Sequence, residues 1–294
     1  MAGTILTTTN PSTVAIGHMK IISDTYGEKP LQYTQIFKDK QARQKTETIP
    51  HLGALGTWQT NNEGSPFNED ELVEGDTAQY ALTIYNHSYD ITYESIRWDQ
   101  YDLLKDKAVN MGRGLRNSQE IAAAAIINNG FATTLGYDGS YLFSNTHDLA
   151  SSASTGDNLT TGDLTDTNVK AAIIVLENTV NESNILIDCQ PRVLWCGTGD
   201  QFVAQTILQS MGAAGELSNN KNVLPGMRLA LMSRLTTGYW GVMDDEVAQL
   251  TFMWFDKPAF GKQDVPGTRN VKVWGYAAFT PGYHDWRGIV GSTG

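Results

Sequence analysis

The sequence predicts a mixed α+β protein, and three of its features lead to that fold class. Two runs, AQYALTIY and SYDITYE, place apolar or aromatic residues at every second position, which is typical of strands with one buried face. Apolar residues then recur at three- and four-residue spacing from Trp98 to Gly130, which predicts one long helix. Helical and strand patterns alternate along the rest of the chain, so helices and sheets both contribute to the fold.

The chain before the long helix predicts two parts. Residues 1–47 are rich in Thr, Ser and Lys with little periodicity, and they predict an extended arm that must lie on another surface. Residues 48–97 predict a long projecting hairpin. The stretch from Gly53 to Asp76 is full of turn residues and holds six carboxylates but no Lys or Arg, so the tip should be acidic. Asn86 and His87 would form the tight turn between the two alternating runs.

The long helix should begin after Trp98 and end at Gly130, which stands where a C-cap would. Its apolar stripe is Leu104, Ala108, Met111, Leu115, Ala122 and Ile126. At 1.5 Å per residue, such a helix would be roughly 45–50 Å long. A polar loop then continues to residue 164. A helix of this length next to a hairpin favours a structural, load-carrying role over a catalytic one.

Residues 165–264 predict a compact mixed portion. One helix should cover residues 167–178, capped by Thr165 or Asp166, and a second should cover residues 200–210. The expected strands are Ile185–Asp188, Val193–Cys196, Leu229–Met232, Tyr239–Met243 and Leu250–Phe255. In residues 265–294, the loop KQDVPGTRN gives way to a closing strand, Val271–Phe279.

Composition excludes several classes of protein. The net charge of −11 argues against a protein that coats DNA through a basic face, because such binding relies on Lys and Arg. No run of eighteen apolar residues predicts a membrane span, and the first residues do not predict a secretory signal. Cys189 and Cys196 have no second pair of cysteines, so we expect no zinc site and a reduced, intracellular setting.

No enzyme signature emerges. The five histidines are spread over the chain, and no nucleophile elbow, phosphate-binding loop or zinc-protease motif is present. We therefore expect no catalytic residues, no cofactor and no metal. The Trp and Tyr content, with the carboxylates, leaves a carbohydrate-active enzyme or binding module as the alternative. However, Trp98, Trp195, Trp240, Trp254 and Trp274 adjoin apolar runs, which favours core packing.

The hairpin holds the candidate functional residues. Its carboxylates lack the ligand spacing of a calcium loop, so they are interpreted either as a solvated face or as a docking surface for a basic partner. Lys105, Lys107, Arg113 and Arg116 on the long helix make a second copy of the chain a candidate partner. The hairpin residues assigned to subunit contacts are Leu55, Trp58, Phe67, Glu69, Asp70, Glu71, Glu74 and Asp76.

The order of these parts resembles that of the major capsid proteins of tailed bacteriophages with the Hong Kong 97-type fold. Within that group the chain is most similar to Mu-type major head subunits. The resemblance covers residues 30 to 294 and is carried by several segments in the correct order. These are YALTIYNHSYDITYESIRWDQYDLL (Tyr80–Leu104), GYDGSYLFSNTHD (Gly136–Asp148), NNKNVLPGMRLALMSRL (Asn219–Leu235) and GYHDWRGIVGSTG (Gly282–Gly294).

The resemblance implies a domain plan and a function. Residues 1–47 would be the N-arm, 48–97 the E-loop hairpin with P-domain strands, and 98–164 the P-domain spine helix with its following loop. Residues 165–264 would be the A-domain, and 265–294 the strand that returns to the P-domain. The implied function is a non-enzymatic major capsid protein that assembles as hexamers and pentamers into an icosahedral shell around double-stranded DNA, without sequence-specific DNA binding.

Partners and location follow from the same resemblance. Some relatives carry an amino-terminal scaffolding segment, for which this sequence has no room before the spine helix, so a separate scaffolding protein is expected. A portal protein and a decoration protein are further expected partners, with no role for a membrane. The protein would belong to the virion and assemble in the cytoplasm of the host bacterium. The hairpin crosslink of the type member needs a Lys, and none occurs between Lys45 and Lys105, so that chemistry is excluded. A decorating or tail-tube protein would not need so long a helix.

Overall fold

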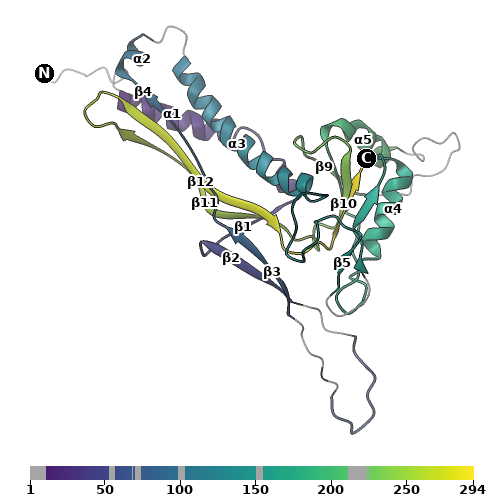
Figure 1. Ribbon diagram of the computed structural model, residues 1–294. Helices are drawn as coiled ribbons and strands as arrows, with labels where there is room; N and C mark the ends of the chain where they lie inside the picture. The colour runs from purple at the N-terminus through teal and green to yellow at the C-terminus, as the bar shows by residue number, and fades with distance from the viewer. Residues whose placement is uncertain are drawn as a thin grey trace.

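The computed structural model has a long four-stranded sheet with three helices, a five-stranded sheet of shorter strands with two further helices, and a projecting pair of strands (Figure 1). The structure describes residues 11–52, 57–67, 69, 74–98, 103–149, 155–210, 224 and 226–294. Both helices and sheets contribute, so the predicted α+β class is confirmed.

A long antiparallel hairpin forms the centre of the first sheet. Its strands, β11 (Leu250–Asp264) and β12 (Val271–Tyr283), are flanked by β1 (Lys38–Gln41), which is parallel to β11, and by β4 (Ile84–Ile91), which is antiparallel to β12. The order is β1-β11-β12-β4. Helix α3 (Leu103–Asn129) runs along this hairpin (Figure 1). Its 27 residues give a length of about 40 Å.

The second sheet has the order β7-β13-β10-β8-β9. Its strands are β7 (Leu159–Thr161), β13 (Ile289–Thr293), β10 (Tyr239–Met243), β8 (Val193–Cys196) and β9 (Arg228–Leu231). Helices α4 (Asp166–Glu177) and α5 (Gln201–Gln209) accompany it. Strand β8, between β10 and β9, is buried at every position, which explains why its sequence VLWC is continuously apolar rather than alternating.

One aromatic core joins the two sheets. Trp195 of β8 and Phe252 of β11 belong to the same buried cluster, although they come from different sheets. Phe143 of the same cluster packs against the second sheet, because its ring lies 5.8 Å from that of Trp195 and over Gly291, where a Cβ atom would lie 2.6 Å from the ring. The short elements η2 (Tyr33–Gln35), β5 (His147–Asp148), β6 (Thr155–Gly156) and η3 (Thr198–Asp200) complete the chain.

The predicted pairing of the two alternating runs is wrong. Strand β3 (Glu74–Ala81) pairs with β2 (Thr46–Leu52), whereas β4 pairs with β12. Asn86 and His87 lie inside β4, opposite Tyr276 and Gly275, and therefore make no turn. A period of two identifies a half-buried strand but not its partner; here β3 pairs with the strand before it, and β4 pairs with a strand far along the chain.

The described part of the long helix begins at Leu103, and the helix ends as predicted. A separate short helix, α2 (Tyr93–Arg97), forms first, because Thr92 and Ser95 make a reciprocal capping box. Helix α3 then ends at Asn129, next to Gly130. Gly130 does not have a positive φ. A Cβ atom there would lie 2.9 Å from the Cβ of Leu142, so close packing explains the glycine.

The predicted extended arm is wrong for its central part. Pro11–Tyr26 forms helix α1, which packs along α3 and buries Ala15, His18 and Ile22. The contact is close at Gly112 of α3, where a Cβ atom would lie 2.7 Å from the backbone oxygen of Ile22. This segment therefore lies on its own subunit.

A pair of glycines in α3 tests this packing. We expect Gly112→Ala to destabilise the subunit by about 1–3 kcal/mol, because the added methyl group has no space against α1. Gly114→Ala meets nothing within 4 Å and should stabilise the subunit by about 0.5–1 kcal/mol through helix propensity. Chemical denaturation of the two variants measures both effects. Equal stabilisation by both alanines would contradict the close contact.

The expected strands and the expected burial of the Trp residues are each confirmed only in part. Strand Ile185–Asp188 does not form; Leu186 makes only an isolated bridge with Val180. Strand β11 extends to Asp264 and pairs with β12. The boundary expected at residue 264 therefore falls within the β11–β12 hairpin. Strand β13 lies in the second sheet. Trp195, Trp240 and Trp254 are buried as predicted. Trp98 and Trp274 are 75% and 37% exposed, so the prediction of core packing is wrong for them.

Candidate subunit-contact surfaces

The β2–β3 pair carries a loop that projects away from both sheets (Figure 1). All the described residues of this loop, 57–67 and 69, are exposed. Trp58 is 102% exposed and Phe67 is 96% exposed, so neither side chain gains any burial within its own subunit. Large apolar side chains left fully in water mark an interaction site.

The remaining predicted loop residues are only partly described. Glu69 is exposed. Leu55, Asp70 and Glu71 lie outside the described residues, as do the side chains of Glu74 and Asp76, although these last two belong to β3. The acidic tip therefore remains a prediction.

The base of the loop is anchored on the first sheet. Tyr80 of β3 is buried with Ala78 and Met253, and its ring packs over Gly282. The Tyr80 hydroxyl lies 3.2 Å from Nδ1 of His284. Burial raises the pKa of Tyr80 above its ordinary value and lowers that of His284 to about 4. Both groups are therefore neutral near pH 7, and the loop leaves from a packed base.

The four predicted basic residues of α3 do not form one patch. Lys105, Lys107 and Arg113 are exposed and make no ion pair among the described residues. Arg116 is half-buried and donates a hydrogen bond from Nη2 to the backbone oxygen of Pro30, at 3.4 Å. Because successive residues are about 100° apart around a helix, Lys105 and Lys107 point to different sides.

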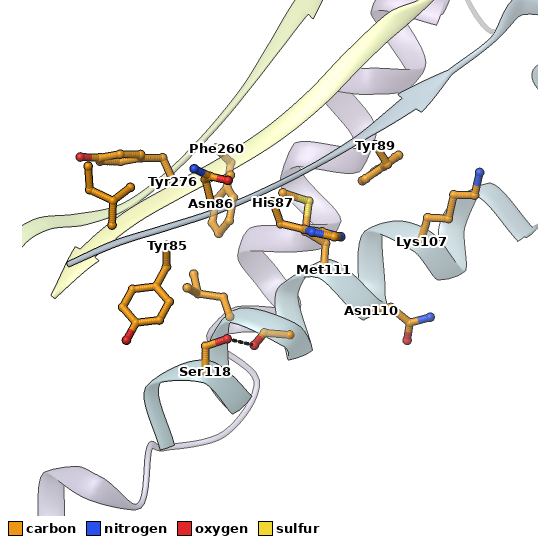
Figure 2. A pocket seen from close by; sticks show the side chains of 14 residues that line it. Tyr85, Asn86, His87, Tyr89, Lys107, Asn110, Met111, Ser118, Phe260 and Tyr276 are labelled. Atoms are coloured by element: carbon orange, nitrogen blue, oxygen red, sulfur yellow. Dashed lines mark hydrogen bonds between the residues drawn. The ribbon is translucent and has the colours of Figure 1, made fainter. Parts of the chain in front are cut away.

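Lys107 lines a groove between β4 and α3 (Figure 2). The groove has a volume of about 680 Å³, within the usual range for a binding pocket. Its walls include Tyr85, Tyr89, Met111 and Phe260, with Lys107 at one end (Figure 2). The other lining residues are Ile84, Asn86, His87, Asn110, Gly114, Leu115, Ser118, Gly275 and Tyr276. Apolar walls with a cation at one end suit an aromatic side chain next to a carboxylate.

Sequence reasoning missed the groove and a second feature, a buried polar cluster around Asn158. His147 Nδ1 lies 2.7 Å from Asp138 Oδ2, its Nε2 lies 3.1 Å from Asn158 Oδ1, and its ring stacks on Trp286 at 4.2 Å. This cluster joins the segment around His147 to the chain end around Trp286. His147 is 0% exposed and reaches no solvent, so its role is structural. Asn158 follows no motif that could have identified it.

Neither of the two cysteines presents a reactive thiol at these surfaces. Cys189 and Cys196 are free and buried, and burial raises their thiol pKa to about 11 and about 12. Within the described ranges no group of His, Cys, Asp and Glu side chains is arranged to hold a metal ion. None of the described helices has the length and apolar character needed to span a membrane.

The family model described as phage capsid protein matches residues 75–292 of the chain. The chain belongs to the phage capsid protein family. A search of curated protein sequences gave no significant match.

Solved structures agree with this membership. The procapsid protein of bacteriophage JBD30 is 14% identical, with 96% of this chain and 74% of that chain covered and a TM-score of 0.52. A chain from Mycobacterium phage Adephagia is 10% identical, with 90% of each chain covered and a TM-score of 0.55. The virus-like particle of Pyrococcus furiosus gives 11% identity, 94% and 97% coverage, and a TM-score of 0.51. These likenesses confirm the Hong Kong 97-type fold, and the carbohydrate-related alternative finds no support.

Proposed function

We propose that this phage capsid protein is the major subunit of an icosahedral shell, assembling as hexamers and pentamers around double-stranded DNA without catalysing a reaction. The observation that carries the proposal is the projecting loop of a capsid-family chain, whose Trp58 and Phe67 are almost fully exposed. Only another molecule can bury them, and closed shells offer many identical copies. We assign the loop to the E-loop, α3 to the spine helix and the second sheet to the A-domain.

We further propose that the E-loop of one subunit docks on the spine helix of its neighbour. In Figure 1 the loop projects away from the end of the first sheet where β4 and the start of α3 lie, so it does not reach its own groove. An aromatic residue of the neighbouring loop suits the apolar walls of the groove, and Lys107 suits the carboxylates Glu63 and Glu69 of that loop. Apolar burial would supply most of the energy, because exposed ion pairs contribute only about 0–1 kcal/mol each.

Further partners follow from the same assignment. We propose a separate scaffolding protein, a portal protein and a decoration protein, with the Mu-type head subunits as the nearest subgroup. The structure of the JBD30 capsid decorated with minor capsid protein trimers supports the decoration partner. The net charge of −11 supports a wall that encloses DNA without adsorbing it. The shell would form in the host cytoplasm and become part of the virion.

Sizing and negative-stain imaging of the purified protein, with and without its scaffolding protein, test the assignment directly. We expect hexamers, pentamers or closed shells. A monodisperse monomer under every condition, with scaffold supplied, would overturn the proposal.

Charge reversal tests the docking contact. We expect the triple variant Glu69→Lys, Asp70→Lys and Glu71→Lys to reduce shell yield strongly and to leave the free subunit folded, since the loop would then carry the same charge as Lys107. Adding Lys107→Glu should restore part of the yield. The readouts are shell yield by sedimentation and subunit folding by circular dichroism. Normal assembly of the triple variant would refute the electrostatic part of the contact.

A further inference from the structure

Four charged side chains meet where the E-loop joins the body. His51 is near the end of β2, Glu182 follows α4, and Asp285 and Arg287 lie between β12 and β13. His51 Nε2 lies 2.6 Å from Glu182 Oε1, and Arg287 Nη2 lies 2.6 Å from the same oxygen. Arg287 Nη1 lies 3.1 Å from Asp285 Oδ1. Glu182 and Arg287 are 8% and 4% exposed, so the contact is largely shielded from water.

Three of these groups form a fixed frame within the body. Arg287 pairs with both carboxylates and also donates from Nε to the backbone oxygen of Val180, at 3.1 Å. None of these bonds involves the E-loop. Among the described residues, His51 connects the loop strand to the frame, and it lies at a register shift of the β2–β3 pair, between Pro50 and Leu52. Such irregularities redirect a side chain out of the regular alternation.

The charge on His51 decides whether the contact is favourable. When the His51 ring is protonated, its charge and that of Arg287 balance the charges of the Glu182 and Asp285 carboxylates. Opposing this, Arg287 Nη1 lies 3.3 Å from His51 Nε2, and burial disfavours the charged ring. His51 Nδ1 lies 3.9 Å from Asp285 Oδ2. The remaining neighbours are the ring of Tyr137, at 6.1 Å, and His284, and both are neutral near pH 7 because burial shifts the pKa of each away from its charged form.

For both His51 and Glu182, the contacts that favour the charged form shift the pKa more than burial does. The hydrogen bond to Glu182 raises the pKa of His51 more than burial lowers it. Burial raises the pKa of Glu182, but the hydrogen bond from His51 and the charge of Arg287 outweigh it and bring the pKa to about 2. Because the pKa of His51 is raised, its stabilising contact is complete below the ordinary value of about 6.5 and is lost as pH rises through the folded value. Glu182 stays ionised throughout that window.

We infer that this cluster is a positioning site for the E-loop, in which protonated His51 holds the root of the loop against the body and its deprotonation releases it. The link between this site and assembly rests on the proposed function, whereas the hold itself is a property of the free subunit. A loop fixed in one direction is already oriented for a neighbour, and a released loop samples other directions.

Distance measurements between spin labels on the full-length, unassembled subunit test the inference. Thr60→Cys in the loop and Glu177→Cys on α4 are exposed positions, and the native cysteines are buried and resist labelling. At about pH 6 we expect a narrow distance distribution, and at about pH 9 loss of that narrow component. His51→Gln should lose the narrow component at both pH values. His51→Lys keeps a cation next to Glu182 and should retain the narrow component at both.

Thr48→Gln is the matched control, because Thr48 is exposed on the same strand, β2, and its replacement should leave the pH response unchanged. A wild-type distribution that does not change with pH, or a His51→Gln variant that matches the wild type at about pH 6, would overturn the inference. Shell yield of His51→Gln is measured separately. Failure of all variants to assemble would count against the proposed function and leave the result on free subunits unaffected.

Discussion

Replacing Trp58 and Phe67 by serine is expected to abolish shell formation while leaving the free subunit as stable as the unmodified protein. Both side chains are almost fully exposed, so the fold of one subunit loses no burial when they are removed. In a contact between subunits, each buried aromatic side chain contributes roughly 1.5–3 kcal/mol. The loss recurs at every loop contact of a shell, so a modest change per contact prevents closure. Negative-stain imaging measures assembly, and chemical denaturation measures stability.

The control for this variant comes from the same loop. Gln59→Ser together with Thr60→Ser alters two exposed polar residues beside Trp58 and should leave both assembly and stability unchanged. Shells formed by the Trp58 and Phe67 variant at wild-type yield would show that the exposed aromatic residues do not carry the contact. A fall in subunit stability would instead place them in the fold.

Elements with strong local signals could be predicted from the sequence. Strand β10 has the predicted bounds, Tyr239–Met243, because a short apolar run between turn residues defines it. Helix α4 has its cap at Thr165, one of the two residues proposed for that position with Asp166, and the Thr165 side chain accepts a hydrogen bond from the Asn168 amide. Caps and buried runs act over a few residues, so they can be recognised without knowing the rest of the fold.

Features that depend on distant partners could not be predicted. Helix α1 has no acidic first turn and no basic last turn, and it gains its stability from packing against Gly112. Strands β3 and β4 are consecutive in the chain, yet they do not pair with each other, because β3 pairs with the preceding strand β2 and β4 pairs with the distant β12. Helix packing and strand pairing are tertiary effects, and these override local propensity.

The candidate subunit-contact surfaces could also be predicted only where they depend on local sequence. The exposure of Trp58 and Phe67 was expected, since an acidic, turn-rich loop cannot bury them. The groove could not be expected, because it is assembled from β4, α3, β11 and β12. The separation of Lys105 from Lys107 around the helix could have been deduced from helical geometry alone. By the same geometry the other two basic residues lie within about 80° of Lys105, so of the four only Lys107 faces the other side of the helix.

Asn158→Ala is expected to destabilise the subunit by about 3–5 kcal/mol, one of the largest effects of any single polar substitution in the described chain. The Asn158 side-chain amide donates to the backbone oxygens of Leu142, Trp286 and Ile289, at 2.8, 3.3 and 3.2 Å. Its Oδ1 accepts a hydrogen bond from the Ser144 amide and faces His147. The residue is 1% exposed, so water cannot replace these bonds.

The expected loss of stability comes from the buried polar groups that Asn158→Ala would leave without a hydrogen-bond partner. The three carbonyls would lose a donor, and the Ser144 amide and His147 Nε2 would lose an acceptor, all at the joint between the two sheets. Asn110→Ala is the control, because Asn110 is exposed on α3 and its loss should change stability by no more than about 0.5 kcal/mol. Denaturation of both variants gives the comparison. An Asn158→Ala variant within error of wild type would mean that the joint relaxes to admit water, and the aromatic core rather than this amide would then hold the two sheets together.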